Sequence, residues 1–232
     1  MKHVNKLATG IFLLSQAVSG AAFAASVTLS GDTVDYTFDD TLLGLYGPAS
    51  LSGDTLYFTP VDFRAESLNG AGFAMTSNTM NIRVTAHDGW LFSNIGLAER
   101  GDYLLLGGGS TADVAGQIRV FDVAAPLTDM TASILPSGPL DHSGLPTTNW
   151  DAAATVDLSA WTTARTVNVT VQDILLASTS AAASVALVDK KFVGLTAGVA
   201  PIPEAQTYAM MLAGLGLIGW KLRRRRVVTP NS

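Results

Sequence analysis

The chain contains no cysteine, so disulfide bonds contribute nothing to its stability in any compartment. Its fold must therefore depend on a hydrophobic core and hydrogen bonds alone. Charged residues are also scarce, at 14% of the 232 residues compared with about 25% in an ordinary soluble domain. The sequence has three histidines and no closely spaced histidine pair, which excludes zinc sites built from cysteine or paired histidine.

Positive charge is nearly absent from the middle of the chain. Between residues 25 and 203 there are seven basic and eighteen acidic residues, and the other basic residues lie near the two ends. A body with this charge repels the phosphate backbone of nucleic acids. We therefore expect no nucleic-acid partner, and an acidic, soluble surface facing an exterior compartment.

The residues of a hydrolytic site are present but are not arranged in a motif. No Gly-x-Ser-x-Gly sequence provides a nucleophile. Asp141-His142-Ser143 are sequence neighbours whose side chains diverge, and His87 lies beside a turn signal. We predict that the protein is not an enzyme and needs no cofactor; a secreted hydrolase that uses His87 or His142 is kept as a third hypothesis.

Two kinds of binding remain open. Trp150 and Trp161 lie in a loop-rich region, where an exposed pair of indole rings would stack on sugars and make the body a carbohydrate-binding module. Trp90 lies in an apolar run, which favours core packing. A structural calcium ion would need only oxygen ligands, and acidic residues crowd the first predicted strand and its neighbours: Asp32, Asp35, Asp39, Asp40, Asp54 and Asp62.

The N-terminus predicts an export signal. Lys2 and Lys6 precede an apolar stretch from Leu7 to Val18, and Ala22-Phe23-Ala24 supplies the small residues that signal peptidase recognises. We expect Sec-type export machinery to translocate the chain and signal peptidase to remove residues 1–24. The alternative is an N-terminal membrane anchor, for which the apolar run is short.

The C-terminal region has three consecutive parts. A short element is followed by an uncharged stretch from Tyr208 to Trp220 and then by a basic cluster. A helix of that stretch rises about 20 Å, whereas the hydrocarbon core of a bilayer is about 30 Å thick, so it is marginal as a permanent transmembrane helix. By the positive-inside rule the basic cluster stays in the cytoplasm, and we expect a transient or permanent inner-membrane association. The residues expected to carry the signal are Pro203, Glu204, Thr207, Tyr208, Arg223, Arg224, Arg225 and Arg226.

This tail resembles the PEP-CTERM sorting signal of Gram-negative bacteria, in which Pro-Glu-Pro precedes an apolar helix and an arginine cluster. The chain departs from the pattern at Ala205, where the family usually has proline. The resemblance implies that an exosortase, a membrane protease, acts near Pro203-Glu204. It also implies delivery to the cell envelope or to an extracellular polysaccharide matrix. A C-terminal anchor that is never processed is the alternative interpretation.

The body, residues 25–198, alternates apolar and polar residues as β-strands do. The clearest rows are Val34, Tyr36 and Phe38; Met80, Ile82 and Val84; Ile118 and Val120; and Val167, Val169 and Val171. Turn signals separate the rows at residues 31–32, 47–48, 52–54, 69–70, 88–89 and 107–109. We predict an all-β, antiparallel β-sandwich of seven or eight short strands, of jelly-roll type.

Three segments are expected to differ from this pattern. Residues 126–161 contain four prolines and are predicted to be a long irregular excursion. Asp189-Lys190-Lys191 is predicted to be the turn of a hairpin between Val185–Val188 and Phe192–Leu195. Residues 197–203 are predicted to link the body to the sorting signal, which occupies residues 199–226 and is followed by a tail at 227–232.

Overall fold

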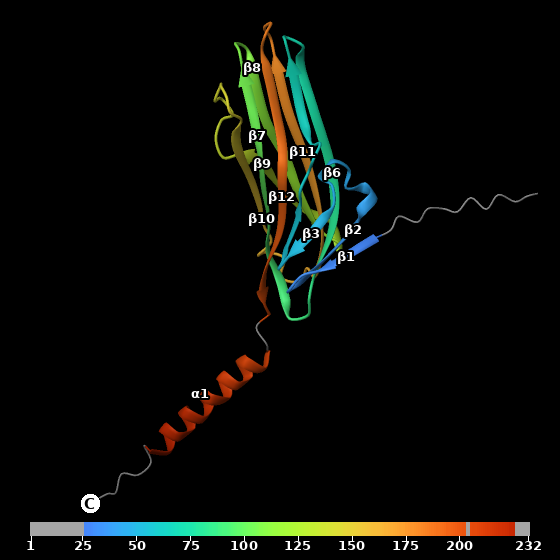
Figure 1. Ribbon diagram of the computed structural model, residues 1–232. Helices are drawn as coiled ribbons and strands as arrows, with labels where there is room; N and C mark the ends of the chain where they lie inside the picture. Colours follow the sequence, from blue (N-terminus) through green and yellow to red (C-terminus); the bar gives the residue numbers. More distant parts are fainter. Residues whose placement is uncertain (1–25, 203–204, 226–232) are drawn as a thin grey trace, which may run out of the picture.

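The computed structural model describes residues 26–202 and 205–225 (Figure 1). These residues form a body of twelve antiparallel strands followed by one helix, α1 (Ala205–Arg225). The predicted all-β, antiparallel class is confirmed. The predicted signal peptide with Ala22 and Ala24 lies outside the described residues, as do Pro203, Glu204 and Arg226.

The strands form one large, nearly closed sheet rather than two separate sheets. The first half-sheet has the order β1 (Ser26–Ser30), β2 (Val34–Asp39), β6 (Gly72–Ala86), β11 (Thr166–Thr179), β8 (Ser110–Asp122). The second half-sheet has the order β10 (Thr148–Asp157), β7 (Trp90–Leu106), β12 (Val185–Pro201), β4 (Thr55–Phe58), β3 (Ala49–Ser52), with β5 (Arg64–Leu68) also paired to β12. β9 (Ala125–Pro136) pairs with both β8 and β10 and so joins the halves, which corrects the expected sandwich of separate sheets.

The strands are more numerous and longer than predicted. β6, β7, β11 and β12 each have 14 or more residues and run along most of the body (Figure 1). The six turn signals, in contrast, all fall at the ends of strands. Gly53 and Gly70 in these turns have φ of 56° and 76°, a conformation that a side chain would strain.

The region predicted to be an irregular excursion is largely β9 and β10, so that prediction is wrong. β9 is exposed over most of its length and therefore has no apolar row that could mark it as a strand. Its two prolines, Pro126 and Pro136, lie near its ends, where they interrupt few ladder hydrogen bonds. β10 does have an inward row, but two of its members, Ala152 and Ala154, are small and give a weak signal.

The predicted hairpin around Lys190 is also wrong, because β12 is one continuous strand. Its pairing with β7 shifts by one residue between Lys190 and Phe192, which is a β-bulge at Lys191. The bulge changes which residues face inward, from Ala186, Val188 and Lys190 before it to Val193, Leu195 and Ala197 after it. β12 then continues to Pro201, so most of the expected linker at residues 197–203 belongs to this strand and that prediction is wrong.

The hydrophobic core lies between the two half-sheets, and each predicted inward row contributes to it. Two short 3₁₀ helices, η1 (Asp40–Leu42) and η2 (Gly44–Tyr46), cover part of it between β2 and β3. Tyr46 from η2 is fully buried and meets the ring of Phe63 edge-on, with ring centroids 5.5 Å apart. Aromatic rings thus fill the core next to the strand on which Lys190 lies.

Candidate functional site

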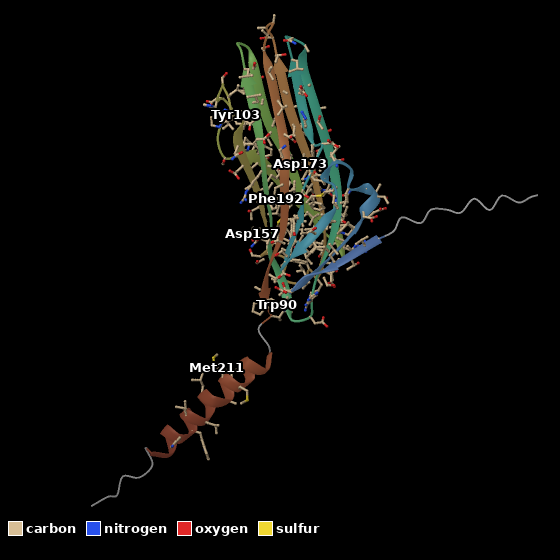
Figure 2. The ribbon with its side chains drawn as sticks, in the orientation of Figure 1. Trp90, Tyr103, Asp157, Asp173, Phe192 and Met211 are labelled. Carbon is tan, nitrogen blue, oxygen red and sulfur yellow. The ribbon has the colours of Figure 1, made fainter. Side chains whose placement is uncertain are left out.

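The C-terminal segment forms the helix that was expected, and α1 includes Thr207, Tyr208 and Arg223 to Arg225. Its apolar side chains face outward: Met210 is 74% exposed and Leu212 66%. Met211, labelled in Figure 2, also projects into open space. No helix in the described ranges 26–202 and 205–225 is both long and apolar enough to cross a membrane, so the predicted transmembrane character of this segment is not confirmed.

The two tryptophans expected to form a sugar-stacking pair do not form one. Trp150 is 4% exposed, and its Nε1–H donates to the carbonyl oxygen of Asp189 at 3.2 Å. It is buried because it occupies the inward row of β10 opposite Gly101 of β7, where the missing side chain leaves room for the indole ring. Trp161 is half-buried and packs against the core. The prediction of an exposed Trp150 is therefore wrong.

The two histidines of the body lie in different surroundings. His87, just after β6, has Nε2 3.0 Å from Oδ1 of Asp35, and both side chains are 34% exposed. The hydrogen bond raises the pKa of His87 above its ordinary value and lowers that of Asp35. His142 lies between β9 and β10, where its backbone N–H donates to Oη of Tyr103 at 3.1 Å. The ring of His87 is paired with a carboxylate and the bond of His142 comes from its backbone, so neither of these contacts joins an imidazole ring to a serine.

Three of the six acidic residues considered for calcium, Asp35, Asp39 and Asp54, have protein hydrogen-bond partners. Oδ1 of Asp54 accepts from the backbone N–H of Thr33 at 2.8 Å, and Oδ1 of Asp39 accepts from the N–H of Thr41 at 3.0 Å. Within residues 26–202 and 205–225, no three histidine or acidic side chains are grouped as a metal site would need.

A feature that the sequence reasoning missed lies in the middle of the body, where Asp173 is labelled in Figure 2. Lys190 on β12, Glu99 on β7 and Asp173 on β11 form a buried charged cluster, and all three side chains are 0% exposed. Nζ of Lys190 donates to Oε2 of Glu99 at 2.6 Å. The same nitrogen lies 2.7 Å from Oδ2 of Asp173 in an ion pair that lacks hydrogen-bond geometry, so neither oxygen of Asp173 has a hydrogen bond.

Aromatic side chains surround the cluster and exclude water from it. Nζ of Lys190 lies 5.2 Å from the ring centroid of Phe63 and 5.9 Å from that of Trp150. Burial raises the pKa of Glu99 to about 8; the charge of Lys190 opposes this rise and that of Asp173 adds to it. Burial and the same two carboxylates also raise the pKa of Tyr46.

The sequence does carry a signal for this cluster. The inward row of β11 is apolar at Val169, Val171 and Leu175 and charged only at Asp173. The inward row of β7 is likewise interrupted by Glu99, between Leu97 and the glycine opposite Trp150. A charged residue inside an otherwise apolar row is costly unless it is paired. Two such interruptions on different strands predict a buried charged cluster, although the partner lysine lies in a polar run, Asp189-Lys190-Lys191, that resembles a turn.

The chain therefore consists of an all-β body followed by a helical C-terminal segment, α1. Residues 201–226 match the PEP-CTERM protein-sorting motif, so the chain carries the sorting signal that its tail resembles. No curated protein matches the chain.

Two solved structures share only remote similarity with the chain. The VP2 subviral particle of infectious bursal disease virus is 10% identical over 78% of this chain and 58% of that one, with a TM-score of 0.23. Tailspike protein 4 of bacteriophage CBA120 is 12% identical over 72% of this chain and 18% of that one, with a TM-score of 0.18. The chain thus spans little more than half of the first and a fifth or less of the second, and neither similarity carries an argument about fold or function.

Proposed function

We propose that the protein is a non-enzymatic exported protein, sorted to the cell envelope or the extracellular polysaccharide matrix by its C-terminal segment. The observation that carries this proposal is the sorting motif at residues 201–226. An exosortase-like protease would act near Pro203-Glu204, after Sec-type export and removal of residues 1–24 by signal peptidase. The acidic, cysteine-free body would be the cargo.

The properties of α1 support a transient stay at the inner membrane. Its apolar side chains are exposed to water, as Leu217 is at 64%. Their transfer from water into lipid or into a protease groove lowers the free energy. Glycines at 214, 216 and 219 have open space where a Cβ would lie, so another helix can approach closely there. The arginines that follow resist translocation and would hold the helix at the cytoplasmic face.

The proposal is tested by replacing Arg223 to Arg226 with glutamine in the native host. We expect the variant to lose its normal trimming and location, because Lys221 alone then remains to stop the segment at the cytoplasmic face. Subcellular fractionation and mass spectrometry of the C-terminal peptide measure both. Arg64→Gln, which removes an exposed arginine of the body, is the matched control. Normal trimming and location of the four-arginine variant would refute the proposal.

A further inference from the structure

The buried charged cluster is difficult to explain as a set of ordinary ion pairs. With Lys190, Glu99 and Asp173 all ionised it carries a net charge of −1, and burying an unbalanced charge strongly destabilises a fold. Three of its four carboxylate oxygens have no hydrogen bond. The raised pKa of Glu99 means that one proton is retained near neutral pH, but the oxygens of Asp173 are still unsatisfied.

The geometry brings an amine against a carboxyl group in the absence of water. Nζ of Lys190 is 2.7 Å from an oxygen bonded to Cγ of Asp173, with both side chains 0% exposed. Two groups held in this way react with effective molarities many orders of magnitude above those in solution.

We propose that Lys190 and Asp173 form a spontaneous intramolecular amide bond, with Glu99 carrying the proton. Glu99, neutral at the outset, gives its proton to the Asp173 carboxylate and takes the ammonium proton of Lys190 through the 2.6 Å hydrogen bond, which leaves a neutral amine beside a carboxylic acid. The lone pair of Nζ attacks Cγ, and the new C–N bond forms. Glu99 gives its proton to the departing hydroxyl group, the C–O bond breaks and one water molecule leaves; Glu99 then takes back a proton from the nitrogen. Glu99 ends in its starting state, and no oxidant, reductant or cofactor is needed.

The contacts assign Asp173 as the acceptor and Glu99 as the proton carrier. The Lys190–Glu99 contact has hydrogen-bond geometry at 2.6 Å, which is the arrangement that proton transfer requires. The Lys190–Asp173 contact lacks hydrogen-bond geometry, so no hydrogen bond between these two groups has to be broken before attack. Glu99 is on β7, which is already hydrogen-bonded to β12, whereas Asp173 is on β11 in the opposite half-sheet.

The bond would join the two half-sheets covalently across the core. A protein without cysteine has no disulfide to resist unfolding outside the cell. An amide cross-link between β11 and β12 closes a loop in the unfolded chain and stabilises the fold as a disulfide does, but it is insensitive to reducing agents. It also replaces three buried ionisable groups with one neutral amide and one neutral carboxylic acid.

Peptide mass spectrometry of the full-length chain tests the proposal directly. Trypsin cleaves after Arg165 and Lys191, and it does not cleave after an acylated lysine. We expect peptide 166–191, uncut at Lys190 and lighter by the mass of one water molecule. A peptide of unreduced mass, cut after Lys190, would overturn the proposal. Joining of peptides 84–100 and 166–191 into one species would show that Glu99 is the acceptor and would overturn the assignment to Asp173.

Matched variants separate the cross-link from other losses of water. Glu99→Gln keeps both reacting groups and the shape of the site, so it should fold and give a peptide of unreduced mass that is cut after Lys190; full water loss would refute the role of Glu99. Lys191→Arg changes the exposed neighbouring lysine and should leave the cross-link intact. Lys190→Arg should abolish water loss, and its persistence would assign the loss to a cyclic imide at an aspartate instead.

Discussion

The burial of Trp150 leads to a prediction that separates a core role from a sugar-binding role. The side chain is 4% exposed, and a buried tryptophan removes about 200 Å² of surface from water. At about 25 cal/mol per Å² this burial contributes up to about 5 kcal/mol, and the hydrogen bond from Nε1 to Asp189 contributes about 1 kcal/mol more. Because the surrounding side chains relax partly into the cavity, we expect Trp150→Ala to lower the free energy of unfolding by about 3–5 kcal/mol.

Urea unfolding followed by circular dichroism measures this loss without depending on tryptophan fluorescence. Trp150→Phe keeps an aromatic ring beside Gly101 but loses the N–H donor, so it should cost about 1–2 kcal/mol. Trp161→Ala, at a half-buried position, should cost clearly less than Trp150→Ala. An unchanged free energy of unfolding in Trp150→Ala would show that the indole ring does not support the core, and the argument from its burial would fail.

Two further predictions concern close packing and pH. Gly101→Ala should strongly destabilise the body, because its Cβ would overlap the carbonyl oxygen of Asp189 and lie 2.7 Å from the Trp150 ring. Gly108→Ala is the control: a Cβ there has nothing within 4 Å, so the thermal unfolding midpoint should change little. Equal midpoints for the two variants would contradict this packing. The His87–Asp35 pair should stabilise the fold most between about pH 4 and 6.5. The pKa of His87 is raised, so its contribution to stability is lost as the pH rises through the pKa of folded His87. The pKa of Asp35 is lowered, so its contribution is lost as the pH falls through the pKa of folded Asp35. Since both side chains are about one-third exposed, His87→Asn should lower the free energy of unfolding by at most about 1 kcal/mol near pH 5 and hardly at all at pH 9. Urea unfolding at the two pH values measures this, and an equal loss at both would contradict the pairing.

The local features of the sequence predicted the fold class well. Strands with a strict apolar row, such as Val167–Val171 on β11 and Met80–Ala86 on β6, are where the alternation placed them. The turn glycines were equally informative, because positive φ is a local property of the backbone. β9 and β10 escaped prediction because an exposed strand and an alanine-rich strand bury too little apolar surface to leave a pattern.

The buried charged cluster escaped prediction for a different reason. The local pattern at Asp189-Lys190-Lys191 is that of a polar turn, whereas Lys190 continues the inward row of Ala186 and Val188 up to the bulge at Lys191. Its hydrogen-bond partner Glu99 is 91 positions away in the sequence, so the pair depends on strand order rather than on local sequence. The C-terminal motif, by contrast, needs no tertiary structure to be recognised, and its prediction was confirmed at residues 201–226.

The most direct test of the account is the C-terminus of the protein recovered from its native host. Mass spectrometry of the C-terminal peptide determines where the chain ends. Sorting by the C-terminal segment predicts a chain that ends near Pro203 and is found in the envelope or extracellular fraction, without α1 or the arginine cluster. A chain that still ends at Ser232 and remains in the membrane fraction would contradict the account and would identify the segment as an unprocessed anchor.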